Sequence, residues 1–159
     1  MINYHKEVKE HIVMAKLDEQ YTRIEAVVGN EEESLNFGDA VNKFYNHLTK
    51  NLQLPCDVTG IEDFRWEERY VFGDGSSKKY QKLRITQPSY QDIFQLLAIK
   101  KDVYSGWMMY HGEDLPGHVR RKSDGKDFYL GLAEIEEVDK KSKNYQLLDD
   151  YVMWFVNNR

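Results

Sequence analysis

The stretch of sequence that decides the fold runs Gly117-His118-Val119-Arg120-Arg121-Lys122, then Ser123-Asp124-Gly125, then Lys126-Asp127-Phe128-Tyr129-Leu130. The two outer segments flank an Asp-Gly pair, which supplies the positive-φ residues that a tight hairpin turn requires. The stretch therefore predicts an antiparallel β-hairpin, and the rest of the chain is interpreted outward from it.

Helices are predicted on both sides of the hairpin, because apolar residues there recur at three- and four-residue intervals. The stripes are Tyr4, Val8, Ile12 and Ala15 over 4–17; Phe37, Val41, Phe44, Tyr45, Leu48 and Leu52 over 36–52; and Leu148, Tyr151, Val152 and Phe155 in a last helix that Ser142 caps. We expect the first of these helices to dock on the rest of the chain through its stripe.

The part between these helices is predicted to be mainly β. Pro55 ends the aromatic helix because it lacks an amide donor and favours extended geometry before it, so a strand begins at Cys56. Residues 68–72 are rich in β-prone side chains and predict a further strand. Ser76 is placed to cap a short helix that Pro88 limits.

Two segments are compatible with more than one structure. Residues 24–28 fit a short strand or a helical turn equally well. Residues 90–99 follow a Ser89–Asp92 pair that resembles a capping box and carry a helical stripe, yet a seven-residue apolar run also suits a buried strand. Propensity alone favours the helix for 90–99.

The charge balance argues against nucleic acid as a partner. Lys plus Arg number 22 and Asp plus Glu number 27, and the resulting formal charge of -5 repels a phosphate backbone. The first residues lack the apolar core of a signal peptide, and no stretch reaches the roughly 18 apolar residues that cross a bilayer. With its single cysteine, the chain is expected to be soluble and cytoplasmic, without a membrane partner.

No spacing in the sequence predicts an enzyme. The five histidines never form His-x3-His or His-Glu-x-x-His, the spacings of helical zinc sites. Cys56 is expected to be an inert buried thiol, and Gly73-Asp74-Gly75-Ser76 lacks the Gly-Lys-Ser/Thr ending of a phosphate-binding loop. A carboxylate pair that only the fold brings together stays open as an alternative.

Four residues are candidates for a protein-binding surface. Trp107 and Tyr110 stand beside two methionines, a pattern that fits an exposed patch or a buried strand. Arg120 and Arg121 belong to the predicted hairpin, where charge on a solvated β edge also serves to block aggregation.

Clusters of acidic residues are the feature of the sequence that points to metal-ion binding. They are Glu31-Glu32-Glu33 with Asp39, Glu62-Asp63 with Glu67-Glu68, Glu134-Glu136-Glu137-Asp139, and Asp149-Asp150. Calcium takes six to eight oxygen ligands, so two clusters that converge in space are sufficient even though no EF-hand loop is present. An acidic run also forms a solvated, mutually repelling face without any ion.

Three stretches occur in an order that carries a family resemblance. Arg23-Ile24 leads to Val27-Val28 and an acidic run, the aromatic helix ends in Leu52-Gln53-Leu54-Pro55, and residues 127–139 precede a last helix that contains Trp154. This order resembles the cyanobacterial-type calcium-binding protein (CcbP-like) family. The resemblance implies a compact, barrel-like β region with a strand over 90–99, and a function in calcium binding.

The chain also departs from the family pattern. Cys56 stands where the family commonly has Phe, Gly131 stands where it has Pro, and Thr49-Lys50-Asn51 replaces acidic residues of the smaller relatives. The matching positions are hydrophobic, so they assign no metal ligand. The acidic residues nearest to them are the candidate ligands: Glu31, Glu32, Glu33, Asp39, Glu62 and Asp63.

The sequence thus predicts an α+β fold, with a small bent antiparallel sheet or SH3-like barrel packed with N-terminal helices and a C-terminal helix. We expect one domain over 1–159, divided into a mainly helical part over 1–53, a mainly β part over 54–140 and a helix over 141–159. The expected function is non-enzymatic calcium buffering or sensing, and the alternative is a protein-interaction module without a specific metal.

Overall fold

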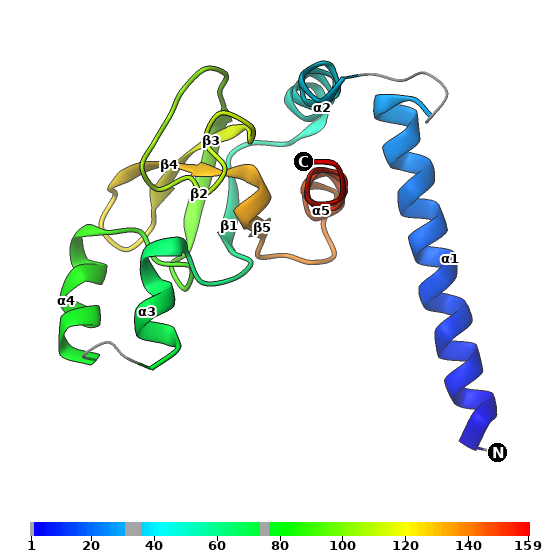
Figure 1. Ribbon diagram of the computed structural model, residues 1–159, viewed down its shortest axis with the longest axis horizontal. Coiled ribbons are helices and arrows are strands. Elements are labelled where there is room, and N and C mark those ends of the chain that lie inside the picture. The colour runs from blue at the N-terminus through cyan, green and yellow to red at the C-terminus, as the bar shows by residue number, and fades with distance from the viewer. Residues whose placement is uncertain (1, 31–35, 74–76) are drawn as a thin grey trace.

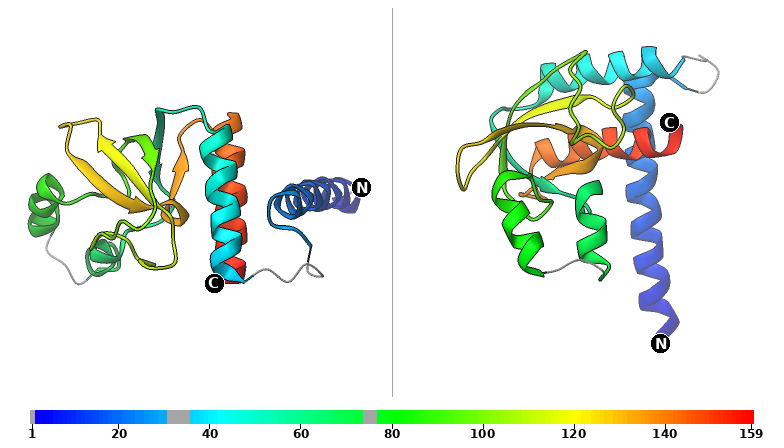
Figure 2. Two further views of the ribbon diagram at one scale, coloured as in Figure 1. Left: turned by 90° about the horizontal axis from the view of Figure 1, so that it is seen from above. Right: turned by 60° about the vertical axis from the view of Figure 1, so that its left-hand side comes forward.

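The computed structural model describes residues 2–30, 36–73 and 77–159, which form three layers (Figures 1 and 2). An antiparallel sheet forms one layer, α2 (Phe37–Asn51) and α5 (Lys143–Asn158) lie beside it, and α1 (Ile2–Val28) packs beyond them. Within the described residues the sheet has five strands in the order β4-β3-β2-β1-β5. The α+β prediction is therefore confirmed, with a sheet that stays open instead of closing into a barrel.

The predicted hairpin forms the β4 edge of this sheet. The strands are β1 (Cys56–Gly60), β2 (Phe94–Ile99), β3 (Pro116–Arg121), β4 (Asp127–Gly131) and β5 (Ile135–Glu137). In the hairpin Val119 pairs with Phe128, and Gly125 takes a φ of 74°. Asp124 does not take the positive φ that was predicted for it, because the connection over 122–126 is longer than a two-residue turn.

The segment 90–99 contains strand β2, as the family resemblance implied and propensity did not. Ser89 N does donate to the Asp92 carboxylate at 2.9 Å, but this contact closes a turn instead of opening a helix. β2 then runs between β1 and β3, where Phe94 and Leu96 are buried on the same face. Tertiary burial therefore overrides the local helical preference.

Helices α2 and α5 share an aromatic core and confirm two predicted helices. Phe44 of α2 lies with its ring centroid 5.5 Å from Tyr151 and 5.2 Å from Trp154 of α5. The predicted cap is also present, since Ser142 Oγ accepts a hydrogen bond from Tyr145 N at 3.0 Å. These contacts fix α5 against the rest of the fold.

The predicted strand over 68–72 is wrong. This segment forms the short helix α3 (Glu68–Val71), which continues the 3-10 helix η2 (Arg65–Glu67) and precedes α4 (Ser77–Thr86). The β-prone side chains have no neighbouring strand to pair with, and Glu67 anchors the segment through its buried carboxylate instead. The helix before Pro88 is confirmed, while its predicted cap at Ser76 lies outside the described residues.

Helix α1 settles the open segment 24–28 as helical but contradicts the expected docking of 4–17. Residues 3–16 are all exposed, and the side chains that meet the body, such as Gln20 and Ile24, both 7% exposed, lie further along. Figure 1 shows the N-terminal half running past α5 and away from the other elements. No helix in the described parts of the chain is long and apolar enough to cross a membrane.

Candidate functional site

The predicted calcium ligands lie in separate places along the described fold. Asp39 is exposed in the first turn of α2, whereas Glu62 and Asp63 follow strand β1. Residues 31–33 lie outside the described residues. Among residues 2–30, 36–73 and 77–159, no three Asp, Glu, His or Cys side chains are grouped so that they could hold a metal ion.

Many other carboxylates are used in ion pairs within the fold. These pairs are Arg23–Asp150 at 2.8 Å, Arg120–Asp127 at 2.7 Å, Arg121–Asp92 at 3.0 Å, Arg121–Asp124 at 2.8 Å and Lys122–Asp57 at 2.9 Å. In the described part of the chain Asp39, Glu62 and Asp63 have no such partner. These three predicted ligands are thus not neutralised by cations of the described residues.

The fold also creates a buried carboxylate pair that sequence analysis did not find as a pair. Asp114, which is 6% exposed, accepts hydrogen bonds from Tyr151 Oη at 2.6 Å and from Ala133 N at 3.0 Å. Glu134, at the end of η3 (Leu132–Glu134), accepts from Met109 N at 3.2 Å. Both carboxylates crowd the Cα of Gly131, so a side chain at that position would displace them.

The electrostatics of this pair favour protonation. Burial raises the pKa of Asp114 to about 7, and the charge of Glu134 acts in the same direction, while the hydrogen bond from Tyr151 opposes them. Burial likewise raises the pKa of Glu134. In the described residues neither carboxylate forms an ion pair with a cationic side chain. Asp114 therefore takes up a proton near neutral pH.

This pair predicts that folding becomes more favourable as the pH falls from 7 to 5. The pKa of Asp114 is about 7 in the fold and 3.8 in its reference state, so the folded chain holds more protons between these values. The free energy of unfolding should rise by about 2 kcal/mol from pH 7 to pH 5. Urea denaturation at both values measures this rise.

Two controls isolate the contribution of Asp114. Asp114→Asn should reduce the pH dependence, leaving a smaller slope from Glu134 and Glu137, whose pKa values burial also raises; a slope that is unchanged in this variant would contradict the assignment. Asp124 and Asp127 act at lower pH, because the hydrogen bonds from Arg121 and Arg120 lower their pKa values to about 2. Their stabilisation is present above about pH 4 and is lost as the pH falls toward 2.

A second buried carboxylate lies beside the cysteine. Glu137 Oε2 is buried and has no hydrogen-bond partner in the described structure, and burial together with Asp139 raises the pKa of Glu137. Burial, with the charge of Glu137, raises the pKa of the Cys56 thiol to about 12. The thiol therefore stays protonated and is not a nucleophile, in agreement with its predicted inert role.

Arg121 is not on an exposed edge, which corrects the prediction for the basic hairpin. Its side chain is 3% exposed and binds both Asp92 and Asp124, as well as three carbonyl oxygens at the end of α4. Arg120 is exposed, but its guanidinium is held by Asp127. The two neighbours differ because side chains alternate between the faces of a strand.

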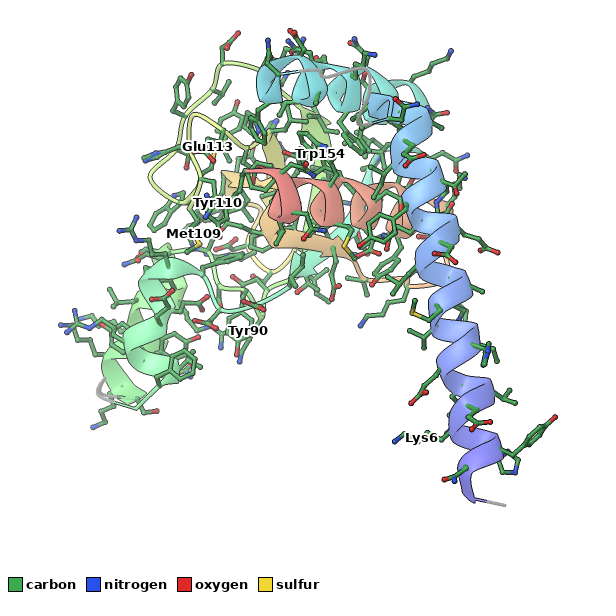
Figure 3. The ribbon with its side chains drawn as sticks, turned by 45° about the vertical axis from the view of Figure 1, so that its right-hand side comes forward. Lys6, Tyr90, Met109, Tyr110, Glu113 and Trp154 are labelled. Carbon is green, nitrogen blue, oxygen red and sulfur yellow. The ribbon has the colours of Figure 1, made fainter. Side chains whose placement is uncertain are left out.

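Trp107 and Tyr110 are half-buried and face different elements. The Trp107 ring lies edge-on to Phe128 of β4 with centroids 6.3 Å apart, and it shares a surface pocket with Trp66. Tyr110 packs on Phe155 of α5 at 5.5 Å and lies under the Arg159 guanidinium at 3.9 Å; Figure 3 labels it beside Glu113 and Met109. A protein-binding role for either residue stays a prediction.

The class that this fold defines is an α+β protein with an open, five-stranded antiparallel sheet and helices packed on its β1–β5 side. Among solved structures, the crystal structure of Anabaena CcbP is similar to it, with a TM-score of 0.52 and 15% sequence identity over 86% of this chain and 89% of that chain. At this identity the likeness shows a shared fold. No protein-family model and no curated protein matches the chain.

Proposed function

We propose that the protein binds calcium weakly through carboxylates at the junction of α1 and α2. The carrying observation is that Asp39, in the first turn of α2, is exposed and has no ion-pair partner among the described residues, and that Glu31, Glu32 and Glu33 precede it by only a few residues. The shared fold with CcbP, a calcium-binding protein, supports the same function.

The number of oxygen ligands that calcium requires supports this position. A calcium ion needs six to eight oxygens, and a site with few protein ligands completes its shell with water. Because the described residues alone do not form a three-carboxylate group, a site with more protein ligands includes residues outside the described ranges, and Glu31, Glu32 and Glu33 are the acidic run there that is nearest to Asp39 in the sequence. Such a surface site should bind in the range of about 0.1–1 mM.

Calcium should therefore raise the melting temperature of the full chain. At about 10 mM calcium and a dissociation constant of about 1 mM, binding to the folded state stabilises it by about 1.4 kcal/mol. For a chain of this length that corresponds to roughly 3–6 °C. Differential scanning calorimetry and calorimetric titration measure the two quantities.

The position is tested with two matched variants. Replacing Glu31, Glu32 and Glu33 by Gln should abolish the thermal shift, whereas Glu62→Gln with Asp63→Asn should retain it. No heat and no shift in the unmodified chain would end the calcium proposal, and a shift lost only in the second variant would place the site after β1.

The second candidate function is a protein-interaction module without a specific metal. The surface pocket that Trp66 and Trp107 line, together with Arg65, favours it, because half-exposed tryptophan and arginine are enriched at protein interfaces. The calcium titration separates the two candidates, since this module predicts no response to the ion.

A further inference from the structure

The N-terminal half of α1 stands apart from the rest of the fold. Every residue from 3 to 16 is exposed, and Figure 3 shows Lys6 on a stretch of helix with no other element around it. The helix is attached further along, where Gln20 bonds Asp149 and Asp150 and Arg23 binds Asp150 in two hydrogen bonds. Single helices of this length are marginal in water without packing.

The exposed half carries an apolar stripe that faces away from the body. Tyr4 is 69% exposed, Val8 39% and Ile12 51%, and Ala15 continues the same row at four- and three-residue spacing. At about 100° per residue, this row is centred roughly 120° around the helix from Gln20, Arg23 and Ile24, which mark the side that meets the body. The stripe is therefore accessible to a second chain that approaches without meeting the body of the first.

The two flanks of the stripe carry opposite charge. Glu7 and Asp18 follow one flank, and Lys9 and Lys16 follow the other. Each acidic residue stands within two positions of a lysine on the opposite flank, about 3 Å along the helix axis. None of these four side chains forms an ion pair within the described chain.

This pattern is complementary to itself in one orientation. When two such helices lie side by side and parallel, related by a twofold axis along them, the acidic flank of each meets the basic flank of the other. In the antiparallel orientation, acidic flanks meet each other and lysines meet lysines. Charge complementarity thus selects a parallel pair.

We propose that the exposed half of α1 is a dimerisation site, at which a second copy of this chain packs in parallel through Tyr4, Val8, Ile12 and Ala15. Glu7 lies near Lys9 of the other copy and Asp18 near Lys16, on both sides of the stripe. The two bodies lie on the outer sides of the helix pair. The small apolar row gives a weak dimer, with a dissociation constant in the micromolar range. This inference is independent of calcium.

Adjacent residues provide a matched test of the stripe. Ile12 and Val13 are similarly exposed, at 51% and 56%, but about 100° apart on the helix, and Val13 lies on the other face. Sedimentation equilibrium of the full chain with a calcium chelator present, from about 1 to 500 µM, should give twice the mass of 18.9 kDa at the upper end. Ile12→Lys should weaken the dimer by about 100-fold or more, and Val13→Lys by less than about threefold.

A charge exchange tests the orientation. Glu7→Lys and Lys9→Glu should each weaken the dimer by several-fold because like charges then meet, and the double variant should restore it because the pairs are re-formed with reversed sign. A monomer at every concentration, equal effects of the two lysine substitutions, or a double variant no better than the singles would each overturn the proposal. Circular dichroism of each variant confirms that the body is folded.

Discussion

Replacing Arg121 by Met should lower the free energy of unfolding by about 3–5 kcal/mol. The Arg121 guanidinium binds the carboxylates of Asp92 and Asp124 and the carbonyl oxygens of Arg84, Ile85 and Gln87. Methionine fills much of the same volume but offers no donor, so the carboxylates of Asp92 and Asp124 and three carbonyl oxygens at the end of α4 lose the hydrogen bonds from Arg121. Asp92 keeps its contacts with Arg84 and Ser89 N, Asp124 keeps Lys126 N, and Ile85 O keeps Lys126 Nζ. Urea denaturation followed by circular dichroism measures the loss.

The neighbouring arginine provides the control for this prediction. Arg120 is exposed and pairs with Asp127 on the other face of β3, in contact with solvent that screens the pair. Arg120→Met should therefore change stability far less than Arg121→Met. If the two variants lose similar amounts, the buried network does not join α4 to the hairpin as the contacts indicate.

The hairpin illustrates how far sequence reasoning reached. The Asp-Gly pair predicted both strands and their antiparallel pairing, although the connection spans residues 122–126 and only Gly125 of the pair takes a positive φ. Side chains alternate between the two faces of a strand, so Arg121 lies on the same face of β3 as Val119, which is fully buried. The sequence therefore contained a signal that Arg121 is buried. Its charge was instead interpreted as a sign of exposure. Of the two carboxylates that make burial favourable, Asp124 is close in the sequence, whereas Asp92 and the α4 carbonyl oxygens come from a distant segment.

The buried carboxylate pair was less predictable because its two members come from different segments of the sequence. Asp114 and Glu134 are separated by twenty residues and meet because β3 and β4 bring both toward Gly131, which no spacing rule describes. The stripe on α1 was recognised from its spacing, but the spacing does not tell which chain will cover it. The segment 68–72 was misassigned because a strand needs a partner that this segment does not meet.

The Glu67 side chain joins η2 to the turn before β2. The side chain is fully buried, and it accepts from Phe64 N and Tyr90 N at 3.0 Å each, from Tyr80 Oη at 2.7 Å and from Ser89 Oγ. Glu67→Leu removes all four acceptor contacts and leaves two amide groups without a partner. We expect it to cost about 4 kcal/mol and to release α3 and α4 first.

The conservative variant separates the hydrogen bonds from the shape of the side chain. Glu67→Gln keeps one oxygen for the two backbone amides, which cannot turn, and presents its NH2 group to the hydroxyls of Tyr80 and Ser89, which can turn and accept. It should therefore cost about 1 kcal/mol, and Glu68→Leu at the exposed neighbour less than about 0.5 kcal/mol. Hydrogen exchange by mass spectrometry should show faster exchange over 77–86 in Glu67→Leu alone. Equal losses in the Leu and Gln variants would mean that charge, not the fixed direction of the amide donors, holds this segment to the sheet.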